Sequence, residues 1–378
     1  MSQSEIPKVT SRLRPVLYLG VFVTPLLPYL GLRFASSPER YNLWAWFGIF
    51  LSLGALPIID HIIGKDHSNP TERQIEALQN NHYYKWLVIL IVPAQLFLLL
   101  YGAYVFSSIG RFNLWGQFGW IFSNGMCSAT IAINAAHELI HKPGRTEHIV
   151  GGFLLATVCN TGFKVDHIRG HHVNLATPKD AYSAFLNQSF YKYLLKTGHR
   201  IIFYPWELEK RRLNRAGHRT LSWRNELFYG WAASAILLTM FYAIFGFKGL
   251  VFFLAQSAVA WFILQGINYI QHYGLIRRNF GPGEYEHPTP AHAWNSNHWL
   301  TNIILLHLPR HPDHHIHPRR SFQALQHIEK SPQMPSGYAA MFLLALIPPL
   351  WFKVMNPRVL AYQSAGQPEA KKFEGNVC

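Results

Sequence analysis

The chain has 378 residues, of which 49% are hydrophobic, 15% aromatic and only 14% charged, so a membrane protein is indicated rather than a globular protein surrounded by water. The net charge of +15 is compatible with nucleic acid, but no recognition motif is present, so the basic residues point to anionic lipid or an acidic redox partner. The cysteines form no C-x2-C pair, so we expect no zinc ribbon and no cysteine-ligated metal site within this chain.

Six apolar stretches have about the 20 residues that are needed to cross a bilayer. They lie at about 15–33, 43–63, 84–107, 113–136, 227–247 and 250–270. A further apolar segment, 338–354, is short and is interrupted by Pro348 and Pro349, so we place it on or beside the membrane. We therefore predict an all-α integral membrane protein with six transmembrane helices.

Basic residues near the ends of these stretches predict the orientation of the chain. Lys8, Arg12 and Arg14 precede the first stretch, and the segment 137–226 has twice as many basic as acidic residues. Because cytoplasmic loops carry the excess of Lys and Arg, both regions are expected in the cytoplasm. An even number of spans puts the segment 271–378 on the same side. We expect a multi-pass protein of the cell inner membrane with both termini cytoplasmic.

We treat 1–378 as one domain in four parts. Residues 1–136 hold transmembrane helices 1–4, 137–226 form a cytoplasmic segment, 227–270 hold helices 5–6, and 271–378 form a second cytoplasmic segment. The two cytoplasmic segments are expected to build a histidine-rich helical cap that carries catalysis.

Three histidine boxes are the strongest chemical signal. They contain His137 and His141, then His167, His171 and His172, and finally His311, His314 and His315. Residues three or four apart share one face of a helix, so each box can direct two or three imidazoles at one point. Imidazole suits Zn, Fe, Cu and Ni, and eight imidazoles exceed the four ligands of one zinc ion. The boxes therefore predict one centre with two metal ions.

Further residues are expected around this centre. His272, at the end of the sixth span, is a ninth candidate ligand. Metal-bound imidazole usually donates its second N–H to a carboxylate or a carbonyl, so the interleaved Glu138, Asp166 and Asp313 are expected to support the ligands. Two histidines near the third box are candidates for a supporting or structural role, namely His292 and His298. We expect the other histidines in loops or on the surface: His61, His67, His82, His148, His199, His218, His287, His307, His317 and His327.

Other classes of site fit these residues less well. The first box alone has the H-E-x-x-H pattern of zinc proteases, but such a site does not need two further boxes. A histidine-lined metal transporter would have ionisable groups within its spans, which are nearly free of them apart from Asp60 and His61. For the basic stretch WELEKRRLNR we favour a solvated helix over a docking site for an electron donor.

Motifs across nearly the whole chain resemble the membrane-bound alkane monooxygenase family, within the membrane fatty-acid desaturase and hydroxylase superfamily. They include NAAHELIHK, RGHHVNLATPKD, NYIQHYGL, AWNSNHWLTNIILLHL and RHPDHHIHPRRSFQAL. The resemblance implies a cytoplasmic di-iron centre, with O2 as co-substrate, that hydroxylates the ends of medium- to long-chain n-alkanes taken from the bilayer. It implies rubredoxin and rubredoxin reductase as separate partners. It also implies nine iron ligands: His137, His141, His167, His171, His172, His272, His311, His314 and His315. No catalytic residue is expected beyond the metal centre.

A few positions depart from the family pattern. Asp166 and Gln271 stand where Glu is usual, and Pro312 stands where Ser is common. Gln271 removes a negative charge beside His272 and is therefore a further candidate supporting residue. The NYIQHYGL motif also resembles the xylene monooxygenase hydroxylase component, so oxidation of aromatic methyl groups is an alternative, as is a fatty-acyl desaturase or hydroxylase. For the substrate we expect an apolar tunnel with walls from the first, second, third and sixth spans.

Overall fold

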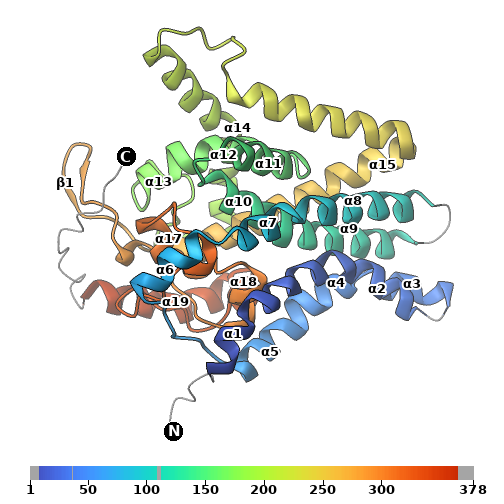
Figure 1. Ribbon diagram of the computed structural model, residues 1–378, viewed down its shortest axis with the longest axis horizontal. Coiled ribbons are helices and arrows are strands. Elements are labelled where there is room, and N and C mark those ends of the chain that lie inside the picture. The colour runs from blue at the N-terminus through green and yellow to red at the C-terminus, as the bar shows by residue number, and fades with distance from the viewer. Residues whose placement is uncertain (1–7, 36, 109–111, 365–378) are drawn as a thin grey trace.

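The computed structural model describes residues 8–35, 37–108 and 112–364, and it is almost entirely helical there (Figure 1). The first apolar stretch is built from α1 (Lys8–Leu17), the 3₁₀ helix η1 (Tyr18–Leu26) and α2 (Leu27–Phe34). Proline explains this division because it lacks an N–H and disturbs the preceding turn. Pro25 lies inside η1, and Pro28 lies in the first turn of α2, where its missing N–H costs nothing.

The second apolar stretch is divided as well. Its pieces are η2 (Pro38–Arg40), α3 (Tyr41–Trp44), α4 (Phe47–Ile49), the π-helical η3 (Phe50–Ala55) and α5 (Leu56–Ile63). Gly48 of α4 faces Ser123 so closely that a Cβ at Gly48 would lie 2.9 Å from the Cβ of Ser123. Small residues therefore let this stretch pack directly on α9 (Leu114–Ser128).

The remaining elements follow in chain order. They are α6 (Glu72–Gln79), α7 (His82–Ile89), α8 (Ile91–Ser107), α9, η4 (Ala129–Ile133), α10 (Asn134–Ile140), α11 (Arg145–Ala156), α12 (Gly162–Asp166), η5 (His167–His171), α13 (His172–Asn174), α14 (Phe190–Arg215), α15 (Glu226–His272), β1 (Asn279–Gly281), β2 (Glu284–Tyr285), η6 (Pro290–His292), α16 (Trp299–Ile304), α17 (His311–Ile316), η7 (Phe322–Ala324), α18 (Tyr338–Ala345) and α19 (Pro348–Ser364). The two strands pair antiparallel in a small hairpin. As expected from Pro348, the helix that begins at Tyr338 ends before the proline pair.

α15 reverses direction at Gly246. This residue has φ +65° and ψ −161°, a backbone conformation that only glycine adopts readily. Figure 1 shows the two halves of α15 running in opposite directions from this point. The fifth and sixth apolar stretches therefore form a hairpin of helices, as their separation in the sequence predicts.

Three helices of the described chain are long and apolar enough to cross a membrane: Leu13–Phe34, His82–Ser107 and Glu226–His272. Phe47–Ile63 is apolar but shorter. The continuous helix 114–140 is long, but it contains polar residues such as Ser123, Asn124 and Ser128, which are fully buried against neighbouring helices. The prediction of a mostly helical protein is confirmed, and three of its helices are candidate membrane spans, whereas the count of six spans stays a prediction.

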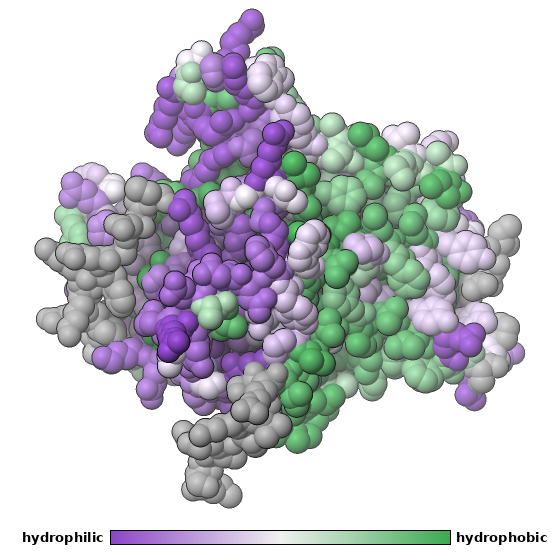
Figure 2. Space-filling model, in the orientation of Figure 1, coloured by the Kyte–Doolittle hydropathy of each residue, from purple (hydrophilic) through white to green (hydrophobic). Residues whose placement is uncertain are grey.

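The surface divides into an apolar and a polar part. Figure 2 shows hydrophobic residues over the side formed by α2, α4, α8 and α9, and hydrophilic residues over the side formed by α6, α13, α17 and the β hairpin. The apolar part is that of a protein that sits in lipid. The histidine boxes lie toward the polar part, where α10, α13 and α17 meet (Figure 1).

Candidate metal centre

The first histidine box lies at the end of a helix that continues beyond its predicted span. α9, η4 and α10 form one continuous helix, and the π-helical turn η4 comes directly before α10. His137 lies in α10, and His141 is its C-terminal cap residue. A π-helical turn inside an α-helix rotates the residues that follow it about the helix axis, and such turns are frequent at functional sites. The turn therefore helps to set the direction in which this box faces.

The second box also lies on a π-helical turn. The turn is η5, which begins at His167 and ends at His171. In a regular α-helix, two residues at this spacing would share a face. In the wider turn the two side chains point to different groups of histidines. The third box forms α17, and Pro312 lies in the first turn of this helix, where a proline is tolerated. His272 is the last residue of α15.

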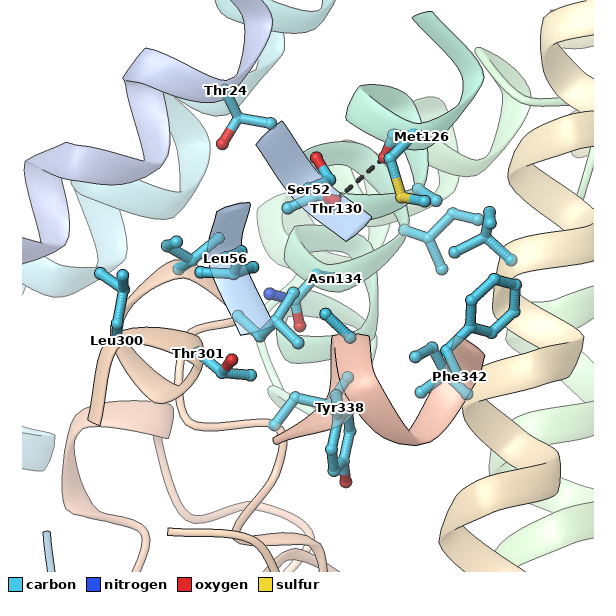
Figure 3. Close-up of a pocket in the computed structure, with 18 of the residues that line it drawn as sticks. Thr24, Ser52, Leu56, Met126, Thr130, Asn134, Leu300, Thr301, Tyr338 and Phe342 are labelled. Atoms are coloured by element: carbon cyan, nitrogen blue, oxygen red, sulfur yellow. Dashed lines mark hydrogen bonds between the residues drawn. The ribbon is translucent and has the colours of Figure 1, made fainter. Parts of the chain in front are cut away.

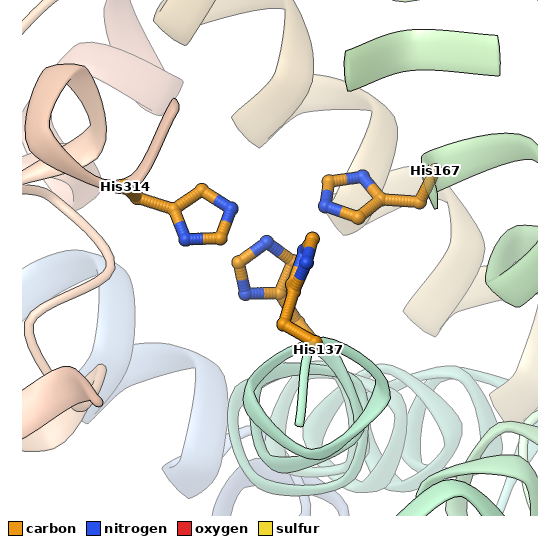
Figure 4. Close-up of side chains that lie close together, drawn as sticks. His137, His167 and His314 are labelled. Carbon is orange, nitrogen blue, oxygen red and sulfur yellow. The ribbon is translucent and has the colours of Figure 1, made fainter. Parts of the chain in front are cut away.

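The histidines gather in two quartets. The first quartet consists of His137, His141, His167 and His314, and the second of His171, His272, His311 and His315. Within each quartet, the nitrogen atoms that could bind a metal all lie within 4.8 Å of one another. Figure 4 shows the rings of His137, His167 and His314 converging from three separate elements. Each quartet therefore offers four imidazole nitrogens to one metal ion.

His172 lies between the two quartets. Its Nε2 atom is 3.1 Å from Nε2 of His167 and 3.2 Å from Nε2 of His314, both in the first quartet. Its ring is also 4.6 Å, centre to centre, from that of His315 in the second quartet. The structure thus brings together all nine histidines that the sequence singled out.

The quartets have the chemistry of a metal site. Burial, and then the neighbouring histidines, lower the pKa of His167, His311, His314 and His315 well below the usual range, so these rings are neutral, as metal ligands must be. Nε2 of His137 and Nε2 of His141 are buried without a hydrogen-bond partner. Buried polar atoms are nearly always paired, so these nitrogens indicate a missing partner. A metal ion in the first quartet would satisfy both.

Asp180 supports the second quartet. Its Oδ2 atom lies 3.0 Å from Nδ1 of His171 and accepts a hydrogen bond from the Ser183 hydroxyl, and its Oδ1 atom accepts from the Tyr182 N–H. Burial would raise the pKa of Asp180, but His171, His272 and the Ser183 hydroxyl lower it to about 2, so the carboxylate is charged. Asp180 was not among the residues expected from the sequence. It is the last residue of the RGHHVNLATPKD motif, so its place in that motif was the available signal.

The carboxylates expected to support the ligands have other partners. Glu138 accepts from Lys142 at 2.8 Å, and Asp313 accepts from Arg320 at 2.7 Å and lies 3.0 Å from His317. Burial raises the pKa of Asp166 to about 7, and its Oδ2 has no hydrogen-bond partner. In the described part of the chain, none of the three has a hydrogen bond to a quartet histidine. Adjacent residues of a helix project in different directions, so closeness in sequence to a quartet histidine does not bring these carboxylates into contact with it.

The remaining candidate supporting residues differ from one another. The His292 carbonyl lies 3.2 Å from Nδ1 of His272 and so supports the second quartet through the backbone. The Gln271 side chain donates to the Tyr338 hydroxyl at 3.0 Å instead of contacting a ligand. His298 lies 3.2 Å from the Ser296 hydroxyl and belongs to neither quartet.

Two of the histidines that were expected in loops or on the surface, His307 and His327, lie in loops but are buried. Nε2 of His307 lies 2.9 Å from the Tyr18 hydroxyl, and Nδ1 of His327 lies 2.6 Å from the Asn297 amide. Both join segments that are far apart in the sequence. An isolated histidine has no periodic pattern, so its burial could not be read from the chain.

An apolar cavity of about 490 Å³ leads to the quartets. Most of its walls are aliphatic side chains, and the cavity ends at His137, His167 and His311. Figure 3 shows Leu56, Met126 and Phe342 among the residues around it. The first, second, fourth and sixth apolar stretches line it, so the expectation of a wall from the third stretch was wrong. The volume lies within the roughly 300–1,000 Å³ of small-molecule sites.

Comparisons with known proteins agree with this site. The fatty acid desaturase family model matches residues 112–345, which include all nine histidines. Alkane 1-monooxygenase 2 of Alcanivorax borkumensis is 43% identical over 365 residues, covering 96% of this chain and 95% of that protein. Alkane 1-monooxygenase 2 of Pseudomonas aeruginosa is 45% identical over 322 residues, covering 85% of each chain. The xylene/toluene monooxygenase hydroxylase component of Pseudomonas putida is 28% identical over 318 residues, covering 82% of this chain and 81% of that protein.

Proposed function

The chain belongs to the membrane-bound alkane monooxygenase family, within the fatty acid desaturase superfamily, and we propose that it hydroxylates the terminal carbon of medium- to long-chain n-alkanes. The product is a 1-alkanol, and the co-substrates are O2 and electrons from rubredoxin. The protein is a membrane-associated, metal-dependent oxidoreductase.

The observation that carries this proposal is the apolar cavity that ends at the histidine quartets. An n-alkane has no hydrogen-bonding group, so a protein can bind it only through apolar contact and shape. The cavity supplies both, because its long walls are aliphatic and only its inner end meets imidazoles. A chain that lies along the cavity presents one end to the metal centre, which accounts for terminal selectivity.

We propose that the two quartets hold two iron ions, with His172 as the ninth ligand between them. Bound there, iron supplies the activation of O2 and the oxidation of an unactivated C–H bond. The protein orients the ligands: the carboxylate of Asp180 keeps the proton of His171 on Nδ1, so that Nε2 is free to face the metal. The aliphatic walls keep water away from the reacting end of the substrate.

We propose six transmembrane segments, with the centre and both termini in the cytoplasm and the protein in the cell inner membrane. Three observations support this topology: the candidate spans, the reversal of α15 at Gly246, and the polar side that carries the boxes. Val23 and Ile59 line the cavity and are about half exposed on the apolar side, so an alkane can enter from the bilayer. The net charge of +15 supports an acidic rubredoxin, reduced by its own reductase, as a separate partner.

Product analysis tests the substrate class. Membranes that contain this protein, rubredoxin, its reductase and NADH receive octane, hexadecane and p-xylene together, and the products are separated by gas chromatography. We expect 1-alkanols as the main products. Methylbenzyl alcohol as the main product would instead favour oxidation of aromatic methyl groups, the activity that the name of the 28% identical relative indicates.

A further inference from the structure

Two asparagines lie at the inner end of the apolar cavity. Asn134 and Asn268 both line it, and both are more than nine-tenths buried, with 5% and 7% of their surface exposed. Asn134 is three residues before His137, and Asn268 is four residues before His272, so each lies one helical turn from a quartet histidine and on the same helix face. Asn134 thus lies one helical turn from the first quartet, and Asn268 lies one turn from the second, where both line the cavity. Figure 3 shows Asn134 between the aliphatic Leu56 and the ring of Tyr338.

Both carboxamides have a free donor. Nδ2 of Asn134 and Nδ2 of Asn268 are buried, and neither has a hydrogen-bond partner in the described part of the chain. Two other polar side chains of the cavity are paired: the Thr130 hydroxyl donates to the Met126 carbonyl at 2.9 Å, and the Tyr338 hydroxyl accepts from Gln271. A buried N–H without a partner is costly, and a hydrocarbon in the cavity cannot provide one. The two donors therefore point to a ligand that carries oxygen.

We propose that Asn134 and Asn268 bind the hydroxyl group of a primary alkanol at the inner end of the cavity. The inference rests on the proposed function, because the alkanol is the product that forms next to the quartets. A hydroxyl group both donates and accepts, so it pairs with either end of a carboxamide. The two residues contribute nothing to the binding of an alkane, which has no polar atom. They retain the product once it has formed and make the cavity selective for alkanol over alkane of equal length.

The test compares retention of radiolabelled 1-decanol and decane by the purified, iron-loaded protein in lipid nanodiscs, with empty nanodiscs as the blank. Asn134→Leu and Asn268→Leu keep the side-chain size and remove the polar group. Each is expected to weaken 1-decanol retention about 2- to 10-fold, the range of one hydrogen bond, and to leave decane retention within a factor of two. Inhibition of turnover by added 1-decanol should weaken by the same factor.

Thr130→Val is the matched control, because it removes a hydroxyl from the same cavity whose hydrogen bond is already made within the protein. It should leave the ratio of decanol to decane retention unchanged. If both Asn variants keep the wild-type ratio, the alkanol site is wrong while the proposed function stands. If the wild-type protein retains neither ligand above empty nanodiscs, the cavity is not the substrate site and the proposed function fails. Should a Leu variant lose iron and decane together, Asn134→Ala and Asn268→Ala give the ratio of 1-decanol to decane retention with a side chain too short to clash with its neighbours.

Discussion

Asp180 is the residue that most directly supports the second quartet, since it holds the imidazole of His171 by its Nδ1 atom. We expect Asp180→Asn to lower iron affinity or turnover about 10- to 100-fold, because the neutral amide stabilises the ligand less and allows the other tautomer. Iron content after dialysis against a chelator measures this. Glu138→Gln is the matched control, because Glu138 pairs with Lys142 instead of a quartet histidine. Equal iron loss in both variants would contradict the assignment of Asp180.

His272 and Gln271 are neighbours with different roles. His272→Ala removes one of four nitrogens from the second quartet, so we expect the loss of about one iron ion per chain and of turnover. Gln271→Glu should keep both ions, because a glutamate can accept a hydrogen bond from the Tyr338 hydroxyl to which Gln271 now donates. Metal analysis of the purified variants checks both. Full iron content in His272→Ala would contradict a nine-histidine centre.

At the residue scale, the sequence predicts which histidines come together, but it does not predict which groups contact them. The nine histidines stand in dense boxes, so their grouping is visible in the chain. The partner of His171 lies nine residues away in a loop, and that of His272 is a backbone carbonyl twenty residues away. Neither contact leaves a local pattern. Glu138, Asp166 and Asp313 are next to box histidines in sequence, but adjacent residues on a helix point in different directions, so this proximity does not predict contact.

Among the elements, the reversal of direction within α15 depends on one glycine, Gly246. Gly246 reverses the helix with a backbone conformation that costs other residues about 1–3 kcal/mol, so Gly246→Ala should lower the midpoint of thermal unfolding by several degrees. Gly152 provides the opposite case: it lies in α11, and a Cβ there would meet no atom within 4 Å. Gly152→Ala should raise the midpoint slightly. Circular dichroism of the protein in detergent measures both, and a higher midpoint in Gly246→Ala would contradict the strained turn.

The apolar stretches were predicted close to their observed positions, because length and hydropathy are local properties. The π-helical turns η4 and η5 were not predicted, since no residue type marks them and packing around the centre decides where they form. The walls of the cavity could not be predicted either. Met126 and Ala129 of the fourth apolar stretch line the cavity, but no pattern in the sequence indicates which helices will enclose a cavity.

For the whole molecule, the quartets connect segments that are distant in the sequence. They join α10, η5, α15 and α17, which come from both halves of the chain. Removal of iron leaves buried imidazoles without partners, so we expect a chelator to lower the unfolding midpoint and re-added ferrous iron to restore it. The effect should be smaller in His272→Ala, which has already lost one site. An unchanged midpoint would mean that the metal does not hold these segments together.

The two quartets draw on the same short segments. η5 supplies His167 to one quartet and His171 to the other, and α17 supplies His314 to one and His315 to the other. An ion that binds in the first quartet therefore fixes the backbone that carries three of the four histidines of the second, namely His171, His311 and His315, so part of the ordering cost of the second ion has already been met. We therefore expect metal loading to be cooperative: during a titration of the iron-free protein with ferrous iron, chains with a single ion should remain scarce, and native mass spectrometry would show the iron-free and two-ion forms side by side.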